Sequence, residues 1–209
     1  MNWVGVMPYV YKPYFDECTA TMAPDFKERI LFVDNTVTNV GIMRSENIGV
    51  DYMRAAEADW LIILSAAIRF GPEGGLDFVE ILEAHPDSYV IHAASSNVKG
   101  GMQQSGESGG ANEVMGWHLT AFHRTLFDNI GIWDENFTPY GLDDIDLSLR
   151  IQKHYKGAPG WETYPCDVHD TKLMGHSLNL GGVQSAYHPR NSYFFRKWGR
   201  EGGEWEKPA

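Results

Sequence analysis

Residues 60–67 read WLIILSAA, an apolar run that no charged side chain interrupts. A strand buried on both faces of a parallel sheet is continuously apolar, whereas a strand with one wet face alternates. The run is also too short to cross a bilayer as a helix, which takes about 20 apolar residues. Residues 60–67 therefore predict a central, fully buried strand.

The chain on either side of this run alternates between strand-like and helix-like patterns. Strands are predicted at Val4–Val10, Ile30–Val33 and Tyr89–Ala94, and helices at Gly49–Ala58 and Gly74–Ala84. The second of these helices repeats its apolar side chains at helical spacing. Strands that alternate with helices in this way predict an α/β fold, in which a mostly parallel central sheet is flanked by helices.

The second half of the chain has a different pattern. Residues 98–112 are rich in glycine and polar side chains, and they are either an inert linker or a lid over a ligand. Beyond them, Gly116–Arg124 predicts a strand, Thr125–Ile130 a short helix and Leu142–Tyr155 a longer helix. The polar tail, residues 199–209, is expected to be flexible.

Length and composition favour a single domain with a full hydrophobic core, because the chain has 209 residues of which 43% are hydrophobic. The net charge of −11 disfavours binding to bulk nucleic acid, since such a surface repels polyanions. Cys18 and Cys166 lie far apart without a zinc-like spacing, which favours free thiols in a reducing compartment. The N-terminus lacks the pattern of a signal peptide, and no apolar run is long enough for a transmembrane helix, so a cytoplasmic protein is expected.

Three short segments follow predicted strands at the place where parallel α/β sheets bind ligands, which is beyond the carboxyl ends of the strands. They are Met7–Tyr9, Asp34–Thr36 and Ser65–Ala67. Asp34 suits two roles, since its carboxylate either closes an Asx-turn or accepts hydrogen bonds from a base or ribose. Taken alone, the Asx-turn is the simpler explanation.

The segment 131–150, GIWDENFTPYGLDDIDLSLR, places adjacent carboxylates at Asp143 and Asp144 in the first turn of an amphipathic helix. Aspartate at a helix start caps free N–H groups and suits the helix dipole. The same pair, beside an aromatic loop that contains glycine, also suits acid–base chemistry. Asp146 lies four residues before Arg150, a spacing at which opposite charges stabilise a helix.

Several segments, taken in order along the chain, match a set of motifs. They are the turn Met7–Val10, the stretches Val33–Thr36 and Asn39–Gly49, the strand Trp60–Leu64, the blocks Trp117–Arg124, Gly131–Phe137 and Asp143–Leu147, and Tyr187–Phe194. Together they resemble inverting glycosyltransferases of family 2, which have the GT-A fold. The resemblance implies one GT-A domain over residues 1–209, with a nucleotide-sugar-binding half at 1–97, an acceptor and catalytic half at 98–198, and the flexible tail.

The resemblance implies transfer of a sugar, with inversion, from a nucleotide-diphosphate donor such as a UDP-, GDP- or dTDP-sugar to a hydroxyl acceptor. One carboxylate then acts as general base, and the family pattern favours Asp144, with Asp143 as its partner. The donor-binding residues that the resemblance implies are Pro8, Tyr9, Asp34, Asn47, Ser65 and Ala67. Arg69 is a further donor-binding candidate, because it lies two residues past the last of these.

Aromatic and histidine side chains in the second half supply further candidates. Trp117, His118 and Trp133 suit stacking on sugar rings, and packing in an aromatic core explains them equally well. His176 is the histidine that the resemblance favours as a metal ligand or diphosphate contact. Its spacing from His169 is not the i, i+4 arrangement of a helical metal site, so the two are not expected to act together.

The chain departs from the family at the D-x-D motif, where Ser65-Ala66-Ala67 stands instead. Those aspartates normally bind ribose and a divalent ion that bridges the diphosphate, and alanine cannot ligate a hard cation. Three explanations remain open. Mn²⁺ or Mg²⁺ is held by other groups such as His176 with Asp144, Arg69 supplies the positive charge, or the protein has lost turnover and only binds nucleotide sugars.

A non-catalytic nucleotide-sugar-binding protein, derived from such an enzyme, is therefore the alternative function. A sugar nucleotidyltransferase is a third hypothesis, since those enzymes have a similar sheet. They carry a glycine-rich phosphate loop just after the first strand, and Met7–Lys12 contains no glycine. This hypothesis is the least favoured of the three.

Overall fold

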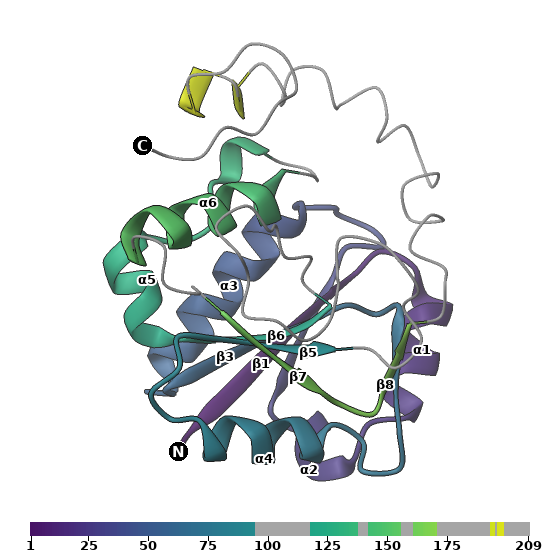
Figure 1. The fold of residues 1–209 in the computed structure, drawn as a ribbon. Coiled ribbons are helices and arrows are strands. Elements are labelled where there is room, and N and C mark those ends of the chain that lie inside the picture. Colours follow the sequence, from purple (N-terminus) through teal and green to yellow (C-terminus); the bar gives the residue numbers. More distant parts are fainter. Residues whose placement is uncertain (95–117, 138–141, 156–160, 171–192, 195, 199–209) are drawn as a thin grey trace.

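A central sheet organises the molecule, and its six strands follow the order β2-β1-β3-β6-β5-β7 (Figure 1). The computed structural model describes residues 1–94, 118–137, 142–155, 161–170, 193–194 and 196–198. Within these residues, β6 is the strand of this sheet that runs antiparallel to its neighbours. The predicted architecture, a mixed and mostly parallel α/β sheet flanked by helices, is confirmed.

The elements alternate along the chain as the sequence predicts, with several short additions. The strands of the central sheet are β1 (Trp3–Tyr9), β2 (Ile30–Asp34), β3 (Trp60–Leu64), β5 (Val90–Ala94), β6 (Leu119–His123) and β7 (Glu162–Pro165). A small antiparallel sheet pairs β4 (Ile68–Phe70) with β8 (Val168–Asp170). The helices are α1 (Lys12–Ala20), α2 (Pro24–Lys27), α3 (Ile42–Ala55), α4 (Leu76–Ala84), α5 (Arg124–Ile130), the 3-10 turn η1 (Glu135–Phe137) and α6 (Asp143–Tyr155).

Helices cover both faces of the sheet, and each face has its own core. Figure 1 shows α3, α5 and α6 on one side and α2 and α4 on the other. Side chains of β3 alternate between the two: Leu61 and Ile63 join the core under α3, α5 and α6, whereas Ile62 and Leu64 join the core under α1, α2 and α4. All five residues of β3 are buried, as its continuous apolar sequence predicts.

Helix α3 starts earlier than the sequence pattern indicates, and the predicted start at Gly49 is wrong. The helix begins at Ile42 and passes through Gly49 without interruption. A Cβ atom at Gly49 would lie 2.5 Å from Cγ1 of Val6 on β1. Glycine is therefore needed there for close packing of the helix on the sheet, and it does not mark a helix boundary.

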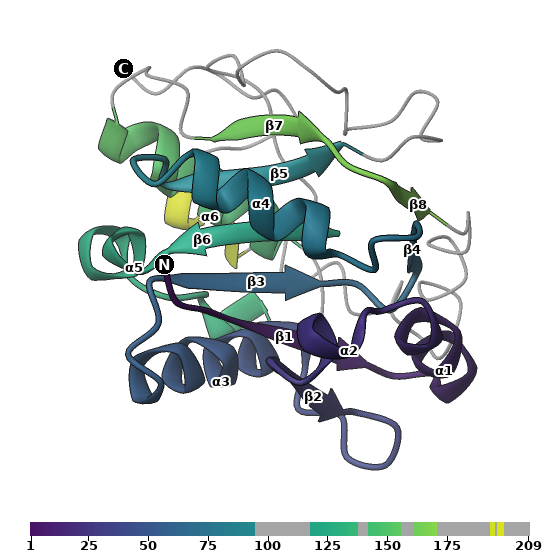
Figure 2. The same cartoon turned by 90° about the horizontal axis from the view of Figure 1, so that it is seen from below.

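The parallel strands end along one edge of the sheet, which Figure 2 shows as a row of arrowheads. Tyr9 at the end of β1 pairs with Asp34 at the end of β2, and Leu64 at the end of β3 pairs with Leu119 at the start of β6. Helix α3 leads into parallel β3 and α6 leads into parallel β7, so both helices run opposite to these strands. The first turns of α3 and α6 consequently lie at the same edge as the strand ends.

Candidate functional site

The ends of β1 and β2 bring Tyr9 and Asp34 together. Their side chains are joined by a hydrogen bond, and the Tyr9 ring stacks on Phe15 with 4.2 Å between ring centroids. The Asp34 Oδ1 atom accepts the backbone N–H of Thr36 at 2.8 Å and its hydroxyl at 2.6 Å. These bonds to Thr36 are the main reason why the pKa of Asp34 is lowered. Asp34 thus forms the Asx-turn that its sequence predicts, and its carboxylate is exposed beside an aromatic pair.

The turn after β3, Ser65–Ala67, is closed by its own hydrogen bonds. The Ser65 N–H donates to the carbonyl of His118 at 2.8 Å, and Ser65 Oγ accepts the N–H of Ala67 at 3.2 Å. The Ala67 side chain is buried. The turn therefore offers one hydroxyl and no carboxylate to a ligand.

Arg69 braces this turn from the side. Its Nη1 atom donates to the carbonyl of Ala66 at 3.0 Å and to that of Ile68 at 2.6 Å. Its Nη2 atom forms an ion pair with Glu17 of α1. Arg69, which the sequence suggests as the positive charge for a diphosphate, therefore lies close to the turn. Its charge is partly compensated by Glu17.

The acidic pair occupies the first turn of α6. Asp143 is buried and Asp144 is half-buried, and the residue before them, Leu142, has a φ of 67°. This left-handed conformation is costly for leucine and rare outside turns and functional sites. The Asp144 Oδ1 atom accepts the N–H of Ile145 at 2.8 Å, and burial raises the pKa of Asp144. A carboxylate whose pKa is raised towards neutrality is a better general base than an exposed one.

Glu46 of α3 is a third acid in this group, and sequence reasoning missed it. Its side chain is 0% exposed, and neither carboxylate oxygen has a hydrogen-bond partner in the part of the chain that the structure describes. Burial, followed by repulsion from Asp143 and Asp144, raises the pKa of Glu46 well above its ordinary value. The signal was present in the sequence, because Glu46 falls on the apolar stripe of a helix that contains Met43 and Val50.

Asn47 connects α3 to the loop before α6. Its Nδ2 atom donates to the Trp133 carbonyl and to Glu135 Oε1, both at 3.0 Å, and its Oδ1 atom accepts the Trp133 N–H at 3.0 Å. The side chain is only 6% exposed. In the structure these hydrogen bonds join α3 to the loop before α6, and donor binding by Asn47 stays a prediction.

The Trp133 side chain lies in the aromatic core rather than at a surface. It is 2% exposed and packs against Phe122 and Phe127, with ring centroids 5.4 and 5.2 Å away. Of the two roles that the sequence left open for Trp133, this placement favours packing over sugar stacking. His118 is half-buried at the start of β6, where its carbonyl supports Ser65.

Two other aspartates of the segment are held by many partners. Asp134 Oδ2 accepts hydrogen bonds from the Tyr193 hydroxyl and the Lys197 ammonium, both at 2.7 Å. Asp146 Oδ1 accepts Lys197 at 2.8 Å and Trp198 Nε1 at 3.0 Å. Although burial opposes it, the hydrogen bonds from Lys197, Tyr193 and Asn136 lower the pKa of Asp134 strongly. These contacts fasten Tyr193, Lys197 and Trp198 to the loop before α6 and to α6 itself.

Arg150 completes this network. Its Nε atom pairs with Asp146 Oδ2 at 2.9 Å, which confirms the helical pair expected from the four-residue spacing. Its Nη1 atom donates to the carbonyls of Ile130 and Ile132 at 2.9 and 3.0 Å. Arg150 therefore holds the end of α5 against α6, which is a structural role.

Other predicted residues lie outside the described part of the chain. They are Trp117, His176 and the glycine-rich loop 98–112. Within the described residues, no group of three or more histidine, cysteine, aspartate or glutamate side chains has a geometry that holds a metal ion. The same residues contain no helix with the length and apolar character needed to span a membrane.

Comparisons with known proteins show what the fold resembles. A scan against protein-family models finds no match, and a search of curated proteins finds none either. Among solved structures, residues 1–349 of TarS from S. aureus match with a TM-score of 0.56 at 11% identity, over 83% of this chain and 61% of that one. This chain thus spans less than two thirds of that structure.

Two further glycosyltransferases share the fold. The mannosyltransferase PcManGT from Pyrobaculum calidifontis, solved with GDP-Man and Mn²⁺, matches with a TM-score of 0.51 at 16% identity, over 78% of this chain and 55% of that one. The catalytic domain of Drosophila β1,4-galactosyltransferase 7, solved with xylobiose, matches with a TM-score of 0.50 at 13% identity, over 78% and 63% of the two chains. At such identities the likeness establishes the fold alone. The fold is the one that these glycosyltransferases have.

Proposed function

We propose that the protein is a glycosyltransferase that uses a nucleotide-diphosphate sugar as donor and a hydroxyl group as acceptor. The observation that carries this proposal is a juxtaposition. The exposed Asp34 beside Tyr9 lies at the same sheet edge as the buried acids at the start of α6, in a fold shared with nucleotide-sugar transferases. Tyr9 and Asp34 suit the nucleoside, since an aromatic ring and a carboxylate provide stacking and hydrogen-bond acceptance.

Asp144 is the proposed general base, with Asp143 as its partner. Its carboxylate takes the proton of the acceptor hydroxyl while that oxygen forms a bond to the anomeric carbon of the donor. The bond from this carbon to the diphosphate oxygen breaks, and the nucleoside diphosphate leaves with the bonding electrons. One displacement inverts the anomeric centre and requires one carboxylate, whereas retaining hydrolysis uses two in separate roles.

The turn after β3 does not fit a divalent ion, because Ser65, Ala66 and Ala67 supply no carboxylate. No step of the proposed reaction is therefore assigned to a metal. The charge of the leaving diphosphate needs compensation, and Arg69 is the described cation closest in sequence to this turn.

The same turn favours a second candidate function, a nucleotide-sugar-binding protein without turnover. A panel of UDP-, GDP- and dTDP-sugars separates the two functions when thermal shift and release of nucleoside diphosphate are measured with and without Mn²⁺. A glycosyltransferase both binds one donor and releases nucleoside diphosphate in the presence of a sugar acceptor. Binding without release under all conditions would support the alternative and would contradict the proposed transfer.

A further inference from the structure

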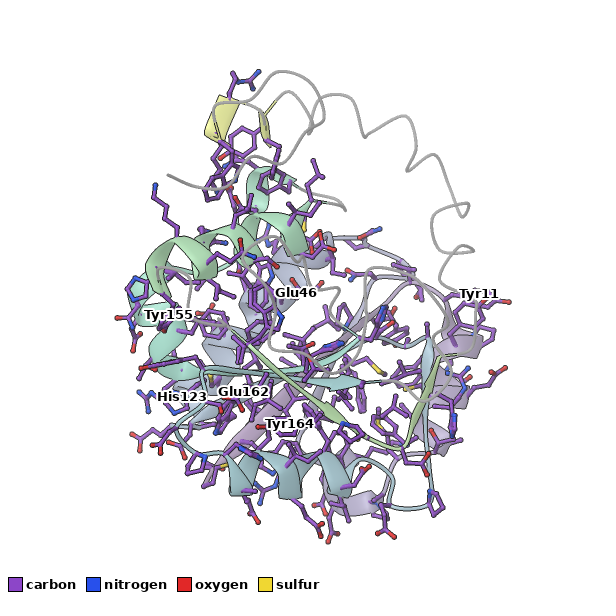
Figure 3. The ribbon with its side chains drawn as sticks, viewed as in Figure 1. Tyr11, Glu46, His123, Tyr155, Glu162 and Tyr164 are labelled. Atoms are coloured by element: carbon purple, nitrogen blue, oxygen red, sulfur yellow. The ribbon has the colours of Figure 1, made fainter. Side chains whose placement is uncertain are left out.

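Glu46 lies on the inner face of α3, within the apolar stripe that packs this helix on the sheet. Met43 and Val50, one turn to either side of it, are fully buried, and Glu46 is equally buried. Figure 3 shows Glu46 inside the molecule, on the side of the sheet that carries α3 and α6. A carboxyl group therefore occupies a position where the pattern of the helix calls for an apolar side chain.

Glu46 forms no ion pair with any residue that the structure describes. Both of its oxygens lack a hydrogen-bond partner among the residues that the structure describes. The charged groups that act on it are Asp143 and Asp144, which carry the same sign.

The strands β1, β2 and β3 and the turn η1, which contact α3, contain no lysine, arginine or histidine, and Arg150 of α6 is paired with Asp146. β3 has no titratable side chain, Tyr9 of β1 bonds Asp34 of β2, and Glu135 of η1 accepts from Asn47. An ionised carboxylate in such a place is costly, and a buried acid responds by keeping its proton.

We propose that Glu46 is a positioning residue of the acidic site, where it remains a neutral carboxylic acid next to the Asp143–Asp144 pair. Its charge state follows from its burial and its neighbours, whereas its effect on turnover rests on the proposed function. A neutral Glu46 leaves the Asp143–Asp144 pair as the local negative charge. An ionised Glu46 would add a third charge and weaken the tendency of Asp144 to stay ionised as a base.

The charge state is tested without any assay of activity, by measuring unfolding against pH for the wild type and Glu46→Gln. A group whose pKa is raised in the folded state binds more protons in the folded protein than in the unfolded one. The protein therefore loses stability as the pH rises above 4.5, the ordinary pKa of a glutamate. Over that window the unfolding equilibrium constant of the wild type rises relative to Glu46→Gln by about tenfold per pH unit. Asp51→Asn is the matched control, because Asp51 is an exposed carboxylate of the same helix. Parallel curves for the wild type and Glu46→Gln would show that Glu46 is ionised and would overturn the proposal.

The effect on turnover is tested with the pH profile of nucleoside diphosphate release. In the wild type the rate falls on the alkaline side as Glu46 ionises, and in Glu46→Gln this limb moves to higher pH. Glu46→Leu, which is also neutral at every pH, moves this limb in the same direction as Glu46→Gln, with little change in the KM for the nucleotide sugar. A pH profile of Glu46→Leu that matches the wild type would show that Glu46 only fills space.

The two experiments separate failure of this inference from failure of the proposed function. A pH-dependent difference in unfolding without any release contradicts the transferase and keeps the neutral Glu46. Release together with parallel unfolding curves keeps the transferase and discards the neutral Glu46.

Discussion

Two sets of acids within and beside the segment 131–150 have opposite surroundings. Asp134 and Asp146 share Lys197 between them, and Asp146 also pairs with Arg150. Asp144 and Glu46 take part in no ion pair in the described part of the chain. Both sets are at least partly withdrawn from water, so burial alone does not explain the difference.

The presence or absence of ion pairs distinguishes acids that stabilise the fold from acids that are candidates for catalysis. A buried carboxylate with cationic and hydrogen-bonding partners keeps its charge and ties elements together. A buried carboxylate without them lowers stability, and such groups concentrate at sites of chemistry. On this basis the proposed base, Asp144, belongs to the acids without ion pairs, whereas Asp134 and Asp146 tie neighbouring elements together.

The largest effect is expected for Asp144→Asn. Removal of the general base lowers the rate of sugar transfer by about 10² to 10⁴-fold, while donor affinity and folding persist. Because burial raises the pKa of Asp144 in the folded state, a neutral replacement does not lower stability at pH 7. Release of nucleoside diphosphate, with thermal shift as the folding control, measures both. Unchanged turnover would remove Asp144 from the mechanism.

Asp146→Asn is expected to act on stability rather than on donor affinity. The change leaves the charges of Lys197 and Arg150 without their buried partner, and loss of one member of a buried pair costs about 3–5 kcal/mol. Urea denaturation measures this loss. The matched control is Asp51→Asn, an exposed acid whose replacement changes stability by less than about 0.5 kcal/mol. Equal stabilities for the two variants would contradict the stabilising role of Asp146 and, with it, the division of the acids into two sets.

Asp134→Asn is expected to destabilise the protein by roughly 2 kcal/mol at pH 7, since it weakens hydrogen bonds to a charged group. The pKa of Asp134 is lowered in the folded state, so its contribution is present above the ordinary value of 3.8 and is lost as pH falls below it. The stabilities of wild type and variant therefore converge in acid. A difference that stays constant down to about pH 3 would show that ionisation of Asp134 is not the source of the stabilisation.

The smallest effect is expected for Arg69→Ala, because Glu17 shares the charge of Arg69. Donor affinity falls by no more than about 1 kcal/mol, the range of a partly exposed pair. Glu17→Gln is the comparison, since it releases Arg69 and leaves donor affinity equal or higher. Calorimetry with the donor measures both variants. Equal affinity in Arg69→Ala and the wild type would discard Arg69 as a phosphate contact.

Much of the fold was predictable because local sequence patterns indicate several of its strands. The apolar run at β3 and the alternation around it led to the parallel sheet, and the resemblance of scattered motifs led to the GT-A architecture. The helix α1 and the short strands β4, β7 and β8 were not predicted. Pairing with distant strands determines these three strands more than local sequence does.

The site was predictable only in part. The acidic pair and the Asx-turn of Asp34 followed from local patterns. The role of Asn47 depends on contact with Trp133, which is 86 residues away, and no local pattern encodes it. The sequence pattern does not single out Glu46, because a helix that starts at Gly49 excludes this residue, whereas α3 begins at Ile42 and buries it.

The most direct test is a crystal structure of the protein with the nucleotide sugar that gives the largest thermal shift among UDP-, GDP- and dTDP-sugars. We predict a nucleoside at Tyr9 and Asp34, with room for one acceptor hydroxyl group between the anomeric carbon and the carboxylate of Asp144. A nucleotide bound elsewhere, or a sugar that points away from the first turn of α6, would contradict it.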